Sequence, residues 1–183
     1  MKKFLLALGV LLVLIMGVLL YIRLVYTKSF SPADKSNFSN GDLQISVLYN
    51  RPFKKGRVIF GELVPYDKVW RTGANEATIF ETNKDLLFED KVLKAGKYSL
   101  FTIPEEQDWT ILFNSETGQW GIDFVSGEAN RDPANDVLAV QALSVRQEKE
   151  FEQFTISVER WGEEIQLIFM WDKTLVSVPF TVK

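Results

Sequence analysis

The 183-residue sequence contains no cysteine and no histidine. Without cysteine there is no disulfide, no thiolate nucleophile, no zinc–thiolate or iron–sulfur site and no acylated lipoprotein cysteine. Without histidine the usual general base and the commonest transition-metal ligand are missing too. These absences exclude much enzyme chemistry, and the remaining residues indicate no metal site and no cofactor.

Acidic residues are absent from the N-terminal end. Residues 1–28 contain four basic residues and no acidic one, whereas residues 29–183 hold 17 of the 21 basic residues and all 24 acidic ones, a net charge of −7. An acidic domain repels phosphate backbones, so we expect no nucleic-acid partner.

Charged side chains are also absent from the 19-residue run between Phe4 and Ile22. As a helix this run spans roughly 28 Å, close to the hydrocarbon thickness of a bilayer. Lys2 and Lys3 precede it, a pattern typical of a signal peptide or a signal anchor. Because the run is long and no small-residue cleavage pattern follows it, we favour an uncleaved anchor over a cleaved signal or a buried core helix.

The orientation of this anchor is only weakly specified, because the basic residues at its two ends nearly balance. With the N-terminus inside, residues 1–3 form a cytoplasmic stub and residues 4–22 a single span through the lipid bilayer. Residues 23–41 are rich in Ser, Asn, Pro and Gly, a composition that predicts a linker. Residues 42–183 then form an extracytoplasmic domain on the periplasmic side.

Alternating apolar and polar residues recur in this domain and predict strands. Such segments lie at 43–50, 77–82, 97–103, 109–113, 154–159, 165–171 and 176–182. The segment 137–146 fits a strand or a helix begun by Asp132 and Pro133. Trp161–Glu164 and Asp172–Lys173 have lengths suited to hairpin turns. We therefore predict an all-β domain, an antiparallel β-sandwich or flattened barrel of about 8–11 strands, preceded by one transmembrane helix.

A cluster of basic residues between Tyr49 and Thr78 is unusual in this acidic domain. Glycines and prolines divide it into turns, so it forms loops on a β-scaffold, where binding residues commonly lie. Two interpretations stay open: the arginines pair with acidic residues and hold the loops, or they bind a ligand. The candidate ligand-binding residues are Arg51, Arg57, Trp70, Arg71, Asn75 and Glu76.

In the binding interpretation, Arg57 and Arg71 hold an anionic group, Trp70 stacks on a ring, and Asn75 with Glu76 orients hydroxyls or amines. The expected function is non-catalytic binding of a small anionic or sugar-like ligand, or of an envelope protein. One alternative is a hydrolase or isomerase with Glu76 as acid or base, although no catalytic residue is assigned. The other is a structural spacer in the cell envelope.

Several runs of sequence also carry a family resemblance. They are Arg51-Pro52, Lys55–Gly61, Leu63–Tyr66, Lys68–Thr78, Ala95–Pro104, Trp109-Thr110 and Trp120-Gly121. In these runs the chain resembles a bacterial family called domain of unknown function 2911. Asp67 departs from it, since the family pattern places glycine there. The resemblance implies an exported or membrane-anchored domain of the cell envelope and brings no established activity.

Overall fold

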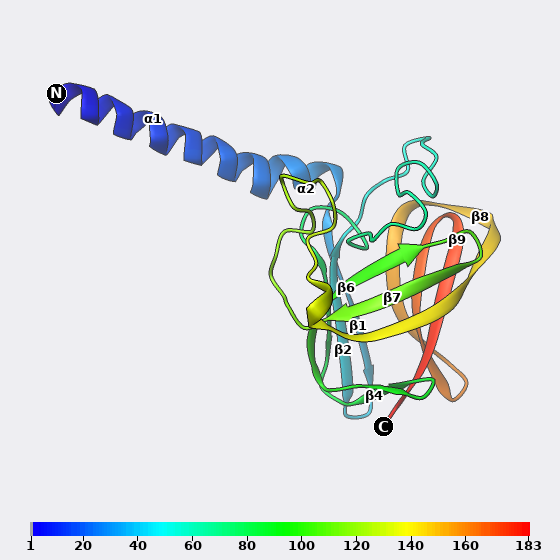
Figure 1. The fold of residues 1–183 in the computed structure, drawn as a ribbon. Helices are drawn as coiled ribbons and strands as arrows, with labels where there is room; N and C mark the ends of the chain where they lie inside the picture. Colours follow the sequence, from blue (N-terminus) through cyan, green and yellow to red (C-terminus); the bar gives the residue numbers. More distant parts are fainter. Residues whose placement is uncertain (1) are drawn as a thin grey trace.

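The computed structural model describes residues 2–183, in which a long N-terminal helix projects from a β-domain (Figure 1). Helix α1 (Lys2–Tyr21) continues through a π-helical turn, η1 (Ile22–Tyr26), into α2 (Thr27–Phe30). No residue of α1 is buried against the domain. The helix is long and apolar enough to cross a membrane, a property that signal sequences share.

The β-domain is built from one antiparallel sheet, which confirms the predicted all-β class. Residues 2–183 form nine strands, in the spatial order β1-β2-β3-β6-β7-β8-β9-β4-β5. The strands are β1 (Ala33–Asn40), β2 (Leu43–Asn50), β3 (Thr78–Thr82), β4 (Leu86–Phe88), β5 (Lys91–Leu93), β6 (Gly96–Pro104), β7 (Asp108–Asn114), β8 (Asp136–Trp161) and β9 (Glu164–Val182).

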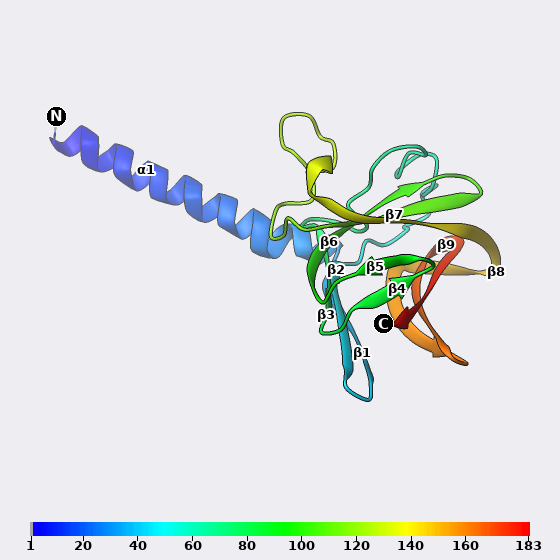
Figure 2. The ribbon, with the colours of Figure 1, turned by 60° about the horizontal axis from the view of Figure 1, so that its bottom comes forward.

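The long strand β8 carries the sheet from one layer to the other. Its first part pairs with β7, and its second part, from Ser144 onward, pairs with β9. Register shifts between Arg146 and Thr155 mark the irregular stretch between these parts, where bulges increase twist and bending. Beyond it β8 meets β2, where the Tyr49 hydroxyl donates to the Ile156 carbonyl (3.2 Å) and accepts from the Ile156 amide (2.9 Å). The sheet thus folds over itself into a flattened sandwich (Figures 1 and 2).

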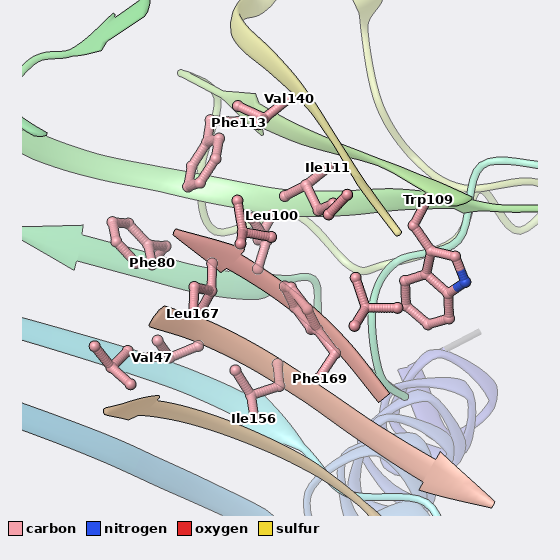
Figure 3. Packing of buried hydrophobic residues seen from close by; sticks show 14 of the residues in the cluster. Val47, Phe80, Leu100, Trp109, Ile111, Phe113, Val140, Ile156, Leu167 and Phe169 are labelled. Carbon is pink, nitrogen blue, oxygen red and sulfur yellow. The ribbon is translucent and has the colours of Figure 1, made fainter. Parts of the chain in front are cut away.

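The core lies between these layers, and Figure 3 shows side chains from opposite strands converging on it. Alternation along each strand sends every second side chain inward, where burial of apolar surface stabilises the fold. Residues at most 1% exposed include Val47, Phe80, Leu100, Trp109, Ile111, Phe113, Leu167 and Phe169.

The prediction of a linker over residues 23–41 is wrong. The helix runs on to Phe30, and β1 pairs with β2 along its whole length, from Ala33 opposite Asn50 to Asn40 opposite Leu43. β1 is an exposed edge strand whose one substantial apolar contact is Phe38 against the core. An edge strand needs little apolar surface, so its polar composition looked like a loop.

The prediction of a hairpin turn at Asp172–Lys173 is also wrong, because both residues lie within the single strand β9. Asp172 has a φ of 53°, and the residues that join the main core cluster change from odd numbers (Ile165 to Trp171) to even numbers (Val176 to Phe180) across it. An irregularity inside one strand produces the same change of phase as a boundary between two strands. The other expected hairpin, at Trp161–Glu164, is confirmed as the β8–β9 turn.

The ambiguous segment 137–146 is strand, not helix, since it belongs to β8. Asp132 and Pro133 start only a single 3₁₀ turn, η2 (Pro133–Asn135). The Asp132 side chain caps this turn by accepting a hydrogen bond from the Ala134 amide at 2.9 Å.

Candidate functional site

The loop region between β2 and β3, residues 51–77, is paired with strand β6 next to Arg71. The Trp70 amide donates to the Thr102 carbonyl (2.7 Å), and the Trp70 carbonyl accepts from the Thr102 amide (3.0 Å), so Trp70 pairs with β6. Fully buried Thr72 donates its hydroxyl to Thr102 Oγ1 at 3.1 Å. Arg71 lies between these two anchored residues, so its backbone position is fixed by β6.

Arg71 has no acidic partner. Across residues 2–183 no ion pair involves it, and its Nε is buried without any hydrogen-bond acceptor. Burial lowers the pKa of Arg71 from its ordinary value, because no carboxylate compensates the lost hydration of the guanidinium. A buried donor without an acceptor is costly, and native structures rarely keep one without a reason.

Gly121 makes room for the Arg71 side chain. A Cβ built on Gly121 would overlap Arg71 Cδ and would lie 2.7 Å from the Asn75 carbonyl oxygen. The Gly121 amide donates to that same carbonyl at 3.0 Å, which holds the loop before η2 against residues 75–77. The Arg71 side chain can therefore take its observed position only because residue 121 has no side chain.

Two clefts meet at Arg71. The first, the helix-side cleft, encloses about 490 Å³ beside the end of α2. The second, the loop-side cleft, encloses about 620 Å³ beside the loop before η2. Both clefts are lined by Leu63, Val64, Trp70 and Arg71.

The helix-side cleft is cationic. Its lining includes Lys55, Arg57 and Arg71 but no carboxylate. The loop-side cleft has mixed charge, with Asp67 and Glu128 beside its basic residues. In a domain with a net negative charge, this local excess of cations favours an anion in the helix-side cleft.

Trp171, from β9, adds a second unpaired donor to the helix-side cleft. Its side chain lines the cleft, and its indole Nε1 is buried without an acceptor. Of the described residues, only three have such unpartnered buried side-chain atoms, and the two donors among them, on Arg71 and Trp171, both belong to the lining of this cleft. Donors without acceptors suit a ligand that supplies oxygen lone pairs.

Arg51, by contrast, is fully engaged within the fold. Its guanidinium donates to the Phe154 carbonyl (3.0 Å) and the Thr155 hydroxyl (2.7 Å), and it pairs with Asp34 (3.0 Å). These partners lie on β8 and β1, so Arg51 joins two strands to the end of β2. The structure places Arg51 outside both clefts.

Arg57 lines the helix-side cleft and is braced by backbone contacts rather than by acids. Its Nε donates to the Lys54 carbonyl at 3.0 Å, and a second nitrogen donates to the Phe53 carbonyl. Lys55, two residues earlier in the chain, lies over the Phe30 ring with Nζ 5.1 Å from the ring centroid. Across the described residues neither cation forms an ion pair, whereas adjacent Lys54 pairs with both Glu150 and Asp172.

Trp70 belongs mainly to the core. It stacks on Trp171 with ring centroids 5.9 Å apart, and its indole donates to the Gly73 carbonyl at 3.1 Å. Only 9% of the residue is exposed. Trp70 therefore contributes to the lining of both clefts mainly as a core residue.

Asn75 and Glu76 line neither cleft and instead connect the domain to the helix. Asn75 Nδ2 donates to the Ser31 carbonyl at 3.4 Å. The Glu76 carboxylate pairs with Lys28 (3.1 Å) and accepts from Asn50 Nδ2 (3.0 Å). Burial by itself would raise the pKa of Glu76, but hydrogen bonds from its own amide, Lys28 and Asn50 outweigh that effect and lower the pKa.

The sequence interpretation missed three residues of this site. Lys55 belonged to the basic cluster but not to the candidate set, although its place two residues before Arg57 was a usable signal. Gly121 lay in a run quoted for the family resemblance. Trp171 had no distinguishing signal, because a tryptophan in a strand ordinarily fills the core. At Asp67 the φ of 59° lies in the left-handed region, which accounts for glycine in the family pattern.

No group of three or more acidic side chains able to hold a metal ion occurs within residues 2–183. In the oxygen-rich segment 130–136, Asp136 accepts from Arg131 Nε at 2.9 Å and from Asn114 Nδ2 at 2.8 Å, and Asp132 caps η2. These carboxylates are thus committed to contacts within the fold.

The described residues therefore define an antiparallel β-domain with an apolar N-terminal helix and a cationic cleft where the two meet. The chain belongs to the family described as "Protein of unknown function (DUF2911)", whose model matches residues 31–180. No curated protein and no solved structure matches the chain.

Proposed function

We propose that this protein is a single-pass, membrane-anchored protein of the cell envelope whose extracytoplasmic β-domain binds a small anionic ligand without transforming it. The ligand sits in the helix-side cleft, with its negative group on Arg71. Arg57 and Lys55 surround the group, and Trp171 donates its indole N–H. Residues 4–22 are the signal anchor, and residues 1–3 stay in the cytoplasm.

The observation that carries this proposal is the unpaired state of Arg71. Lys54, in the same basic cluster but outside the cleft, pairs with Glu150 and Asp172, whereas Arg71 has no acidic partner among the described residues. A partly buried arginine without an acceptor pays a desolvation cost that an incoming carboxylate or phosphate removes. The planar guanidinium also suits such groups, because it can donate two parallel hydrogen bonds.

Binding is favoured over catalysis by the position of the acid/base candidate. Glu76 lines neither cleft, and both of its carboxylate oxygens are engaged, one by Lys28 and one by Asn50. Its lowered pKa keeps it ionised at neutral pH, which suits an ion pair and not a general acid. A purely structural spacer has no use for unpaired donors around a cleft.

The test is a ligand titration of the full chain in detergent, read by thermal unfolding. The probes are inorganic phosphate and glucuronate, with glucose as the uncharged control. A ligand at 100 times its dissociation constant adds about 2.7 kcal/mol of stability, a readily measured shift. We expect phosphate, glucuronate or both to stabilise the wild-type protein, and glucose to have no effect.

Three variants assign the site. Arg71→Met removes a charged donor, and we expect binding to weaken by roughly 10- to 100-fold. Trp171→Phe keeps an aromatic ring but removes the N–H, so binding weakens by about threefold to tenfold. Arg160→Met is the matched control, because Arg160 contacts Gly162 and Asn40 near the β8–β9 turn and lines neither cleft. Equal shifts in all four proteins, or no shift in the wild type, would contradict the proposal.

A further inference from the structure

A short loop beside the end of the helix exposes two large apolar side chains. Phe124 is 80% exposed and Val125 is 97% exposed. They lie in the loop 123–128, which precedes η2 and forms part of the wall of the loop-side cleft. Exposed apolar residues at a loop tip mark an interaction surface when something on the molecule says what covers them.

The loop holds these side chains in a fixed position. Asp123 Oδ1 accepts hydrogen bonds from the Val125 amide (2.9 Å), the Ser126 amide (2.8 Å) and the Ser126 hydroxyl (3.1 Å). The Gly127 amide donates to the Asp123 carbonyl at 2.9 Å, and Ile122 pairs with Ala129 at the base of the loop. The one carboxylate next to Phe124 is therefore already hydrogen-bonded within the loop.

Two ring contacts lead from this loop to the end of the apolar helix. The Phe124 ring stacks on the Trp120 ring at a centroid distance of 6.0 Å and an angle of 22°. The Arg23 guanidinium lies over the other ring of this pair, 5.1 Å from the Trp120 centroid. Arg23 directly follows Ile22, the last residue of the apolar run.

The level of the loop relative to the helix is fixed by further contacts at the junction. Lys28 pairs with Glu76, Asn75 donates to the Ser31 carbonyl, and Lys55 covers the Phe30 ring. Figures 1 and 2 show the loop before η2 reaching back from the domain alongside the end of the helix. The depth at which Ile22 leaves a bilayer thus also sets the depth of the loop.

We propose that the loop 123–128 dips into the surface of the same bilayer that α1 spans, with Phe124 and Val125 among the lipid headgroups. This inference rests on the membrane anchoring proposed above and not on the ligand site. Each headgroup layer adds about 5–8 Å outside the hydrocarbon core, so Arg23 lies within that layer. Aromatic side chains such as Trp120 are enriched at this depth. The helix and the loop then form two attachment points that fix the domain's orientation and hold the loop-side cleft next to the membrane.

The chain contains no cysteine, so a single introduced cysteine is the only site at which a thiol-reactive spin label can attach. Val125→Cys is spin-labelled in the full chain, reconstituted in phosphatidylcholine vesicles. Accessibility is measured by collision with oxygen, which concentrates in lipid, and with a water-soluble nickel chelate. Leu143→Cys is the matched control, an apolar residue 72% exposed on β8 and paired with Asp108 of β7. Leu12→Cys, in the middle of α1, reports on the anchor itself.

We expect the Val125 label to be several-fold less accessible to the nickel chelate than the Leu143 label, with a depth between those of Leu143 and Leu12. A Val125 label as accessible to the chelate as Leu143, with Leu12 inside the bilayer, would overturn the loop contact and leave the anchor intact. A Leu12 label in water would overturn both. A Val125 label that is immobilised but open to the chelate indicates a covering protein, and so overturns the bilayer as the occupant.

Discussion

Arg51 and Arg71 stand near the two ends of the same loop region, and the fold treats them in opposite ways. Arg51 has three partners on two other strands, all within 3.0 Å. Arg71 has no partner within the described chain, and its Nε is buried. The contrast separates the two interpretations of the basic cluster: the Arg51 end is held by contacts within the fold, and the Arg71 end is the part on which the proposed ligand binding rests.

The same contrast extends to the neighbours of each arginine. Lys54, beside the Arg51 end, pairs with two carboxylates, which together with their hydrogen bonds raise the pKa of the lysine. Lys55 and Arg57, only one and three residues further on, face the helix-side cleft without an acid. Arg51 and Lys54, which lie outside the helix-side cleft, are thus paired with carboxylates, and the basic side chains that line the cleft are not. The following variants test this difference.

The largest effect is expected for Arg51→Ala. The change leaves the Phe154 carbonyl without its charged donor and removes the ion pair to Asp34, so we expect the free energy of unfolding to fall by about 2–4 kcal/mol. Urea titration of the full chain, followed by tryptophan fluorescence, measures the change. Arg160→Ala serves as the comparison and should cost under about 1 kcal/mol. If both variants lost the same free energy of unfolding, the proposed structural role of Arg51 would be contradicted.

An intermediate effect is expected for Gly121→Ala. The new methyl group overlaps Arg71 Cδ and crowds the Asn75 carbonyl, so stability should fall by about 1–3 kcal/mol and phosphate or glucuronate binding should weaken as the guanidinium shifts. Gly118→Ala is the control: its Cβ meets open space, and its φ of 89° costs about 1 kcal/mol without disturbing the cleft. Unaltered binding in Gly121→Ala would show that the path of Arg71 is not set by this glycine.

The smallest effect on stability is expected for Arg71→Met, although its effect on binding is the largest. Methionine keeps much of the side-chain volume and removes an unpaired, partly buried charge, so the free energy of unfolding should stay constant or rise by up to about 1 kcal/mol. The same urea titration, without added anion, gives the value. A loss comparable to that of Arg51→Ala would mean that Arg71 also holds the fold together, and the comparison between the two arginines would fail.

The strands were predictable wherever a strand has one buried face. β2 alternates Leu43, Ile45, Val47 and Tyr49 toward the core, and its strand period is evident in the sequence. β1 was missed because both of its faces are largely exposed, so no alternation was required of it. β9 was divided in two because the irregularity at Asp172 reverses which residues face inward, and periodicity alone does not distinguish this from a turn.

The candidate site was predictable as a region but not as a set of contacts. Local composition identified the basic cluster, and Arg57, Trp70 and Arg71 do line the helix-side cleft. Asn75 and Glu76 do not line it. Their side chains are held instead by Ser31, Lys28 and Asn50, which lie far from them in the sequence, so local composition could not reveal these contacts. Whether an arginine is paired depends on residues about a hundred positions away, as with Arg51 and Phe154.

By itself, the sequence determined the apolar N-terminal segment, the all-β class, the family resemblance and the excess of cations between Tyr49 and Thr78. These properties follow from composition and from short-range periodicity, which act over a few residues. Only the tertiary structure decided which cations are neutralised, which donors remain unpaired and where the loop 123–128 lies relative to the helix. Pairing and burial depend on distances in space, and β8, by crossing from one layer to the other, brings together residues that the chain keeps far apart.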